Sequence, residues 1–424
     1  MTRNWSEEAR RRDEADRLAP FRARFHVPAG TVYMDGNSLG PASVDALESL
    51  ERAAREWREL AIGGWLDARP DWFTYGERIG AKMAPLVGAE PEEVALVGST
   101  TANLHSLVAT FYRPGGTRRK ILADELNFPS DLYALASQVR LQGGDPAKDL
   151  ILAKSADGRT LDEEALISLM DDTVAVAVLP AVLYRSGQLL DLRRLARAAH
   201  ERGIVIGFDC AHSVGSVAHH LHDDDVDFAF WCTYKHLNGG PGSPAGLFVH
   251  RRHFQREPGL AGWFGYVKER QFDLALHFEH APSASGWQMG SPSILSAAAL
   301  DGALNLFEEA GILTVRAKSL ELTSFLIELA EARLAPLGFE VGTPLEPDRR
   351  GGHVALEHAE GWRICRALKA RGIVPDFRPR RVIRLAPVAL YSTFAEVEHT
   401  VSALEDIVRK REYEAFSSER AAVS

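Results

Sequence analysis

The sequence predicts an α/β fold with a mainly parallel sheet, followed by a smaller α+β part. Between about residues 94 and 250, short apolar runs rich in β-branched residues alternate with stretches of helical periodicity. Such runs are typical of parallel strands, which are buried on both faces because helices cover both sides of the sheet. After about residue 300, a long helical stretch leads into shorter strands, which indicates an α+β arrangement.

Apolar periodicity assigns the elements along the chain. The first 30 residues are predicted to be a charged helix with Ser6 as its N-cap. Apolar residues from Leu104 to Phe111 recur at helical spacing, and Gly203 stands where a helix C-cap is expected. Strands of the large sheet are predicted at 94–98, 120–124, 174–180, 204–209, 227–232 and 246–250, and those of the smaller part at 339–344, 353–358 and 382–387, with a helix near 360–371.

The length of the chain predicts more than one domain. A chain of 424 residues is longer than one hydrophobic core usually supports. We expect a helical N-terminal segment over 1–60 that packs with the smaller domain, a large domain over 61–300, and a small α+β domain over 301–424.

Composition narrows the functional class. Acidic residues outnumber basic residues by 58 to 49, for a net charge of -9, which argues against binding to nucleic acid or to an anionic membrane. The three cysteines form no CxxC pair, the N-terminus has no apolar signal region, and no apolar run approaches the ~20 residues that span a bilayer. We therefore expect a soluble cytoplasmic protein.

Lysine is scarce, and Lys235 stands out among nine lysines. It follows the apolar run DFAFWC and precedes a glycine-rich turn, and no other lysine occurs between Lys154 and Lys268. A lysine amine held in a partly dry site can form an imine with a carbonyl group. An ordinary exposed lysine is the simpler interpretation, but its place at a strand-to-loop junction favours chemistry.

Three further segments complete a pattern around Lys235. Asp209 ends the run IVIGFD, where a buried carboxylate needs a cationic partner; capping of the next turn is the alternative. Thr100 and Thr101 begin a helix directly after a strand, which suits either a phosphate site or a simple N-cap. In NFPSD, Phe128 can stack on a flat ring and Asp131 adds a carboxylate; core packing and a loop aspartate are the alternatives. Together these features match pyridoxal phosphate, which needs a phosphate anchor, a carboxylate at its ring nitrogen and an amine.

Two other motifs are weaker. Gly240, Gly242 and Ala245 satisfy G-x-G-x-x-A, but they precede a strand and do not open a helix, so dinucleotide binding is not predicted. The run AHHLHDDDVD over 218–227 could hold a metal ion, but it lacks helical ligand spacing, and a solvated loop is favoured. We predict no metal site.

The sequence resembles the kynureninase family of fold-type I pyridoxal phosphate enzymes. The matching segments extend over nearly the whole chain: MDGNSLGP (34–41), TTANLHSL (100–107), FPSDLYA (128–134), GFDCAHSVG (207–215), FWCTYKHLNGGPGSPAG (230–246), GWFGY (262–266), MGSPSI (289–294) and IRLAPVALYSTFAEV (383–397). The resemblance implies a large domain with a mainly parallel seven-stranded sheet, pyridoxal phosphate as cofactor, and a homodimer with shared active sites.

The resemblance also assigns roles to residues. Lys235 would hold the cofactor and move protons, Asp209 would pair with its ring nitrogen, and Tyr234 could donate a proton during C–C cleavage. Arg384 would bind the substrate carboxylate, and Ser38 would line the substrate cavity. The full set of implied cofactor contacts is Thr100, Thr101, Phe128, Pro129, Ser130, Asp131, Asp209, His212, Tyr234, Lys235, Trp263 and Ser291.

In the family, the positions that match Trp263 and Ser291 reach into the partner's site. Family members often carry Asn or Thr where this chain has Ser291, which leaves open the preference between kynurenine and 3-hydroxykynurenine. Pro180 lies where a hydroxyl side chain can contact the phosphate, so a contact there would come from the backbone.

The implied reaction is hydrolysis of L-kynurenine to anthranilate and L-alanine, in tryptophan catabolism and NAD biosynthesis. Two alternatives stay open: another fold-type I enzyme (a cysteine desulfurase, aminotransferase or epimerase), and a metal hydrolase that uses residues 219–225. A desulfurase needs a reactive cysteine on a mobile loop, whereas Cys365 lies in a helical pattern and Cys210 and Cys232 lie at strand ends.

Overall fold

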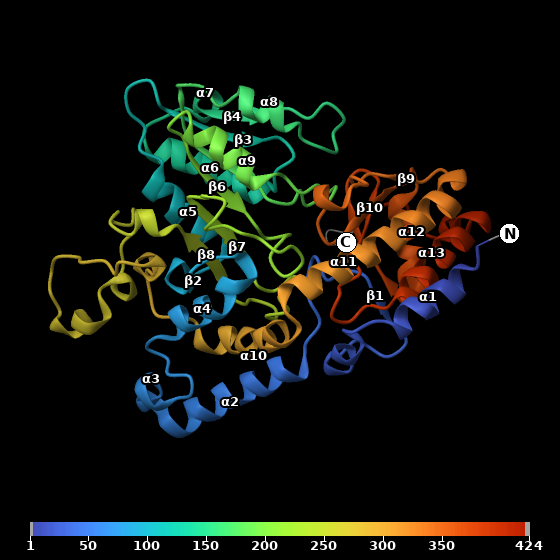
Figure 1. Ribbon diagram of the computed structural model, residues 1–424, viewed down its shortest axis with the longest axis horizontal. Coiled ribbons are helices and arrows are strands. Elements are labelled where there is room, and N and C mark those ends of the chain that lie inside the picture. The colour runs from blue at the N-terminus through green and yellow to red at the C-terminus, as the bar shows by residue number, and fades with distance from the viewer. Residues whose placement is uncertain (1–2, 420–424) are drawn as a thin grey trace.

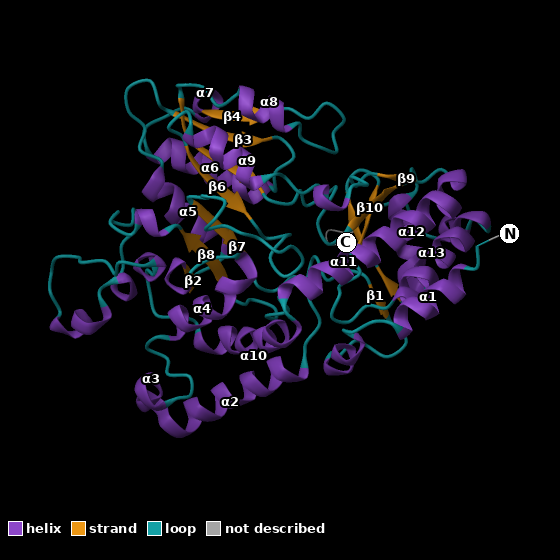
Figure 2. Ribbon diagram, viewed as in Figure 1, coloured by secondary structure: helices purple, strands orange, loops and turns teal. Residues whose placement is uncertain are grey.

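The computed structural model describes residues 3–419, which fold around a seven-stranded sheet and a separate four-stranded sheet (Figure 1). Figure 2 shows the strands gathered in two places, each surrounded by helices. The α/β architecture predicted from the alternating apolar runs is confirmed. Among the described residues, no helix is both long and apolar enough to cross a membrane.

The large sheet is mixed and mostly parallel. Its strand order is β2-β8-β7-β6-β5-β3-β4, and only β8 runs antiparallel to both of its neighbours. Six of its strands coincide with predicted runs, whereas β4 was not among them. The strands are β2 Val94–Val97, β3 Lys120–Asp124, β4 Leu150–Ala153, β5 Val174–Pro180, β6 Val205–Asp209, β7 Phe228–Trp231 and β8 Ala245–Val249.

The two faces of this sheet are packed into different apolar clusters. On β5, Ala177 and Leu179 belong to one cluster, while Val176 and Val178 belong to the other. This alternation follows from the two-residue period of a strand. Both faces are therefore dry, which explains why the strands have continuous apolar sequences.

Helices connect the strands and cover the sheet. They begin at side chains that cap free backbone N–H groups, such as Ser99 before α5 and Asp191 before α9. The α-helices are α1 Trp5–Glu14, α2 Val44–Leu60, α3 Gly64–Asp67, α4 Tyr75–Val87, α5 Thr100–Phe111, α6 Pro129–Leu141, α7 Pro146–Asp149, α8 Glu163–Ser168, α9 Leu192–His200, α10 Ile294–Ala310, α11 Ile312–Leu329, α12 Gly361–Ala370 and α13 Phe394–Arg409.

The C-terminal part has its own apolar cluster, formed by α11, α12, α13 and a four-stranded antiparallel sheet. Its strand order is β12-β13-β10-β9. The predicted strands and the helix near 360–371 are all present, and β1, β11 and β12 are additional. The remaining strands are β1 Val32–Tyr33, β9 Glu340–Val341, β10 Val354–Glu357, β11 Ile373–Val374, β12 Asp376–Arg378 and β13 Val382–Leu385.

The N-terminal segment differs in detail from the prediction. The first helix, α1, is N-capped by Asn4 and not by Ser6, because the Asn4 side chain accepts a hydrogen bond from Glu7 N–H. It ends at Glu14, and a short 3-10 helix follows at Ala19–Arg24. Helix α1 packs on α13, whereas α2 packs along α10 (Figure 1). The division into domains at 60 and 300 stays a prediction.

The tightest packing in the sheet gives a testable stability effect. A Cβ atom added to Gly207 on β6 would lie 1.9 Å from the ring of Phe228, which itself stacks on Phe111. We expect Gly207→Ala to lower the free energy of unfolding by about 1–3 kcal/mol, the usual cost of overpacking. Chemical denaturation measures this change. Gly115→Ala, where nothing lies within 4 Å of the added atom, is the control and should be close to neutral; equal stability of the two variants would contradict the packing argument.

Candidate active site

Lys235 lies in the loop that follows β7, where the carboxyl ends of the parallel strands meet. Its Nζ is 2.9 Å from Nε2 of His212, which lies in the loop after β6. His212 is buried, and its pKa is held well below its usual range by burial and by the positive charge of Lys235. The neutral imidazole can therefore accept a hydrogen bond from the lysine ammonium.

Three carboxyl groups lie close together at this edge of the sheet, and the charge of Lys235 acts on two of them, Asp209 and Asp131. Asp209 ends β6, Asp124 ends β3, and Asp131 lies in the first turn of α6. Burial raises the pKa of Asp209, and the charge of Lys235 opposes that rise. Burial and the nearby charge of Asp209 raise the pKa of Asp131 well above its usual range, and the two carboxyl groups share a hydrogen bond. The charge of Lys235 thus favours the ionised form of Asp209, whereas the charge of Asp209 favours the neutral form of Asp131.

The N-termini of two helices meet at the same edge of the sheet. Thr101 in the first turn of α5 and Ser130 in the first turn of α6 place their hydroxyl oxygens 2.8 Å apart. Thr100 and Pro129 are the first residues of these helices. Free N–H groups, hydroxyls and two helix dipoles therefore point to one place, which is an arrangement that binds phosphate.

Phe128 directly precedes α6, and 47% of its surface is exposed. Its ring makes an edge-to-face contact with Tyr184, with centroids 5.3 Å apart, and Tyr184 in turn contacts His212. The open face of the phenyl ring is thus free to stack on a flat ligand.

Arg384 reaches the site from β13 in the C-terminal part. Its guanidinium is fully buried and donates to the carbonyl oxygen of Tyr184 at 2.5 Å and to Ser38 Oγ at 3.3 Å. The structure thus brings Ser38 and Arg384 to Tyr184, which contacts the large-sheet residues Phe128 and His212, although these segments are distant in sequence. The backbone carbonyl of Tyr234 also accepts a hydrogen bond from Gly40 N–H at 2.8 Å, which ties the GNSLGP segment to the Lys235 loop.

Two predicted residues are not brought to this place within one chain. Trp263 is 48% exposed, packs against Phe264 and Phe272, and donates to the carbonyl oxygen of Gln271. Ser291 is also exposed. Within residues 3–419, no hydrogen bond or ring contact joins either of them to Lys235, Asp209 or Arg384.

The histidine and aspartate run is dispersed by the fold. His219 pairs with Ser213, Asp224 with Arg193, and His222 with the buried Glu93. Within residues 3–419, one group of potential metal ligands forms, from Glu93, His222 and His250. The two imidazole rings are stacked, however, at 12° and 4.8 Å between centroids. Because a ring nitrogen binds a metal in the plane of its ring, two parallel planes cannot both direct a lone pair to one ion.

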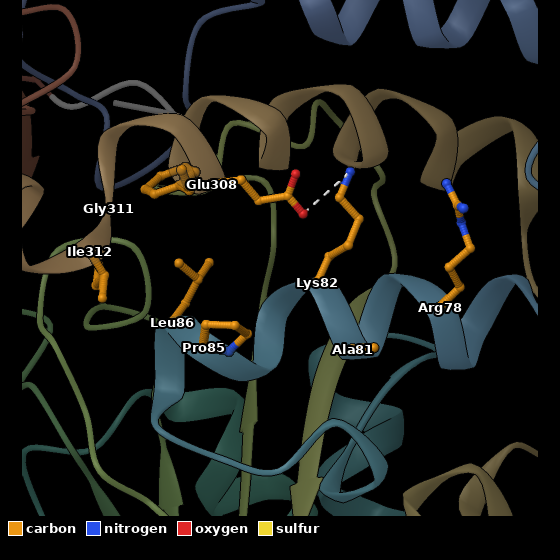
Figure 3. Close-up of a pocket in the computed structure, with 9 residues that line it drawn as sticks. Arg78, Ala81, Lys82, Pro85, Leu86, Glu308, Gly311 and Ile312 are labelled. Carbon is orange, nitrogen blue, oxygen red and sulfur yellow. Dashed lines mark ion pairs between the residues drawn. The ribbon is translucent and has the colours of Figure 1, made fainter.

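A hollow of about 700 Å³ lies elsewhere, between α4 and α10 (Figure 3). None of the predicted site residues lines it. Its Lys82 is neutralised by Asp301 at 3.0 Å and by Glu308 at 3.9 Å. This hollow therefore offers no unpaired lysine charge to an anionic ligand, and we do not assign the chemistry to it.

Several residues at the site were not predicted from the sequence. Asp124 carried the same signal as Asp209, since both end a buried strand, and burial raises the pKa of Asp124 to about 7. Tyr184 and His353, which lies 5.8 Å from His212 between ring centroids, carried no local signal. Asp35 and Asp376 also carried no local signal, and only the folded structure shows that they contact Ser38 and Arg384.

Comparison with known proteins identifies the family. Residues 315–404 match the family described as the kynureninase C-terminal domain. The chain is 52% identical over 416 residues to a kynureninase of Geobacillus thermodenitrificans, which covers 98% of this chain and 97% of that protein. The chain belongs to the kynureninase family. A kynureninase of Bacillus anthracis is also 52% identical, over 97% of this chain and 96% of that protein. The family resemblance drawn from the sequence motifs is confirmed.

Solved structures similar to this family member support the fold. A cysteine desulfurase of Thermococcus onnurineus superposes with a TM-score of 0.78 at 17% identity, covering 92% of this chain and 98% of that one. A structure of C-DES with glycine covalently linked to its PLP cofactor has a TM-score of 0.78 at 16% identity, covering 91% and 99%. At this level of identity the likeness concerns the fold alone, and it confirms the predicted fold type.

Proposed function

We propose that this chain is a pyridoxal phosphate-dependent hydrolase that cleaves L-kynurenine to anthranilate and L-alanine. The observation that carries the proposal is the convergence of Lys235 and Arg384 on one buried histidine. Lys235 Nζ lies 2.9 Å from His212 Nε2, and the charges of Lys235 and Arg384 both lower the pKa of His212. An amine for the cofactor and a guanidinium for an amino acid carboxylate therefore face the same space, in a member of the kynureninase family.

The residues present fit pyridoxal phosphate. The Thr101 and Ser130 hydroxyls and the two helix N-termini would hold the phosphate, and Asp209 would hold the protonated ring nitrogen. The exposed face of Phe128 would stack on the ring, and Lys235 would hold the cofactor covalently. Within residues 3–419, a buried oxygen of Asp131 and the Nδ1 atom of His212 have no hydrogen-bond partner, so polar groups remain available to a ligand.

The protein groups then have distinct tasks. Pyridoxal phosphate, when bound, supplies an electron sink. Arg384 orients the substrate by its carboxylate, and Lys235 moves a proton at the substrate α-carbon. The neutral His212 next to Lys235 can accept a hydrogen bond from the amine and so hold it in place.

Tyr234 suits the cleavage step. Hydrolysis adds the oxygen of water to the γ-carbonyl carbon, breaks the Cβ–Cγ bond and places a proton on Cβ. Burial raises the pKa of Tyr234 above its usual range, so its hydroxyl stays protonated at neutral pH. It can therefore donate the proton that Cβ needs.

Cysteine desulfurase chemistry is less favoured, although desulfurases share the fold. That reaction needs an accessible cysteine nucleophile. Cys210, Cys232 and Cys365 are all buried, and burial raises the pKa of each thiol. These thiols are inert by the usual criteria of thiolate fraction and access.

We also propose a homodimer in which each site takes Trp263 and Ser291 from the partner. Large apolar side chains near Trp263 support this, because Phe272, Leu274 and Leu276 are all more than two-thirds exposed. Exposed apolar surface of this kind is typical of an interface. The segment that carries them projects from the large sheet in Figure 1.

Mixing two inactive variants tests the shared site. Lys235→Ala and Trp263→Ala chains should each be impaired, whereas co-expression should restore activity, because a hybrid dimer holds one intact site. With random pairing, roughly one site in four is intact. Light scattering should give a dimer mass. A monomer mass, or no restoration from a mixture proven to contain hybrids, would contradict the shared site.

We further propose that the enzyme works in the cytoplasm, in tryptophan catabolism and in the supply of precursors for NAD. Three free cysteines support a reducing compartment.

Initial rates on L-kynurenine and 3-hydroxy-L-kynurenine, measured side by side, test the proposed function and its substrate preference. The purified holoenzyme should release fluorescent anthranilate from the first. No release of either aromatic acid, while the cofactor is bound at Lys235, would reject the substrate assignment.

A further inference from the structure

Arg384 is held by a buried carboxylate. Asp376 on β12 is its cross-strand neighbour, and one carboxylate oxygen of Asp376 accepts hydrogen bonds from Nε, at 2.5 Å, and from Nη2. The other oxygen accepts from Arg378 Nη1 at 2.8 Å. Arg384 and Asp376 are 0% and 4% exposed, so this pair is well shielded from water.

These contacts decide which edge of the guanidinium a substrate can reach. The Nε–Nη2 side is occupied by Asp376, and one N–H of Nη1 donates to the Tyr184 carbonyl. The remaining N–H groups lie on the terminal edge, where Nη2 makes only a long contact of 3.3 Å to Ser38 Oγ. A carboxylate can therefore approach end-on, between Nη1 and Nη2 and beside the Ser38 hydroxyl.

Ser38 connects this edge to a second carboxyl group. The Ser38 hydroxyl donates a hydrogen bond to the side chain of Asp35, which stabilises the charged form of Asp35. The other oxygen, Asp35 Oδ1, is buried and has no hydrogen-bond partner among the residues that the structure describes. A hydroxyl has a single hydrogen, so Ser38 can donate it to Asp35 or to a substrate carboxylate, but not to both.

The charges around Asp35 make a second carboxylate costly. The groups whose charge acts on Asp35, or is affected by it, come from several elements: Asp376 and Arg378 on β12, Arg384 on β13, Tyr33 on β1, Tyr391 before α13, and Cys365 on α12. The tyrosine and cysteine groups are neutral at physiological pH. With Asp35 ionised, two arginines and two aspartates cancel, and a substrate carboxylate would leave one uncompensated buried negative charge.

We propose that Asp35, Ser38, Asp376 and Arg384 form a proton-linked receptor for the substrate carboxylate. Asp376 is a positioning residue that presents the terminal edge of Arg384, and Asp35 takes up one proton when the carboxylate binds. The proton neutralises Asp35 and releases the Ser38 hydrogen to the substrate. This inference rests on the proposed role of Arg384 and extends it to the way in which the site recognises an amino acid.

The coupling between carboxylate binding and proton uptake by Asp35 makes the affinity for L-alanine depend on pH. Burial and the nearby charge of Asp376 raise the pKa of Asp35 to about 6. Below that pH Asp35 is already protonated, and above it each bound carboxylate must bring a proton. The predicted quantity is the Kd for L-alanine of the wild-type holoenzyme divided by the Kd of Asp35→Asn. This ratio should rise about tenfold per pH unit above pH 6.

The experiment is a spectroscopic titration of each holoenzyme with L-alanine between pH 5.5 and about 8. Dividing the wild-type Kd by the Asp35→Asn Kd cancels titrations shared by both proteins, such as that of the ligand amine. The ratio should be flat at the acid end and rise toward neutral pH. Asp348→Asn, an exposed aspartate of the C-terminal part, should track the wild type. Ethylamine, which lacks the carboxylate, should give a flat ratio throughout.

Calorimetry of the wild type provides a second measurement that needs no variant. The heat of L-alanine binding in buffers of different ionisation enthalpy counts the protons taken up, and L-alanine should take up close to one more proton than ethylamine at pH 7.5. Equal proton counts, or a Kd ratio that does not change with pH, would overturn the inference even if the enzyme cleaves kynurenine. Proton-linked L-alanine binding without kynurenine cleavage would instead uphold the receptor and reject the proposed function.

Discussion

Lys235→Ala should lower the rate of L-kynurenine cleavage by at least about 10³-fold, because it removes both the covalent link to the cofactor and the base at the substrate α-carbon. The visible absorption of the lysine–pyridoxal linkage should disappear as well. His212 would lose the amine that lies 2.9 Å from its Nε2 atom. Stopped-flow anthranilate fluorescence and an absorption spectrum of the same sample measure the two effects.

The matched control for this variant is Lys120→Ala, at the opposite end of the same sheet, where β3 begins. It should keep both the absorption and the activity. If Lys235→Ala retained the visible absorption, another amine would hold the cofactor, and the assignment of Lys235 would be wrong.

Arg384→Gln should lower kcat/KM for L-kynurenine by about 10²–10³-fold, equivalent to about 3–4 kcal/mol, because a buried charged partner of the substrate carboxylate is lost. Arg384→Lys keeps the charge but not the two-nitrogen edge, and we expect it to recover only part of the loss. Steady-state kinetics of the three proteins measure these differences.

A substrate without the carboxylate provides the control for Arg384. The wild type should prefer L-kynurenine strongly over its decarboxylated analogue kynuramine, and Arg384→Gln should lose most of that preference. Arg381→Gln removes a half-exposed arginine that pairs with Glu357, and should leave the preference intact. An unchanged preference in Arg384→Gln would show that another group binds the carboxylate.

Local sequence was sufficient to predict much of the fold, and it singled out several of the residues that the fold brings to one edge of the large sheet. Asp209 ends a continuous apolar strand, and Thr100 and Thr101 begin a helix after another strand. In a parallel sheet such positions meet at one edge, so their proximity follows from the strand order. Strand β4 was not predicted although its sequence, LILA, is entirely apolar; it lies at the edge of the sheet, and three of its four residues are only half-buried.

The substrate side could not be predicted from local sequence alone. Arg384 and Ser38 are separated by 346 positions, and Arg384 and Tyr184 by 200. No periodicity encodes such contacts, so the role of Arg384 came from the family resemblance. Asp376 faces Arg384 only because a hairpin pairs β12 with β13. His222 was considered as a metal ligand, but its partner Glu93 lies 129 positions away and its ring stacks on His250.

The most direct test of the central claim is the stoichiometry of product release from L-kynurenine by the purified holoenzyme. Lys235, Asp209 and Arg384 together predict anthranilate and L-alanine in equal amounts, with no release by Lys235→Ala. Formation of neither product by a holoenzyme that carries the cofactor on Lys235, or of alanine without anthranilate, would contradict the account.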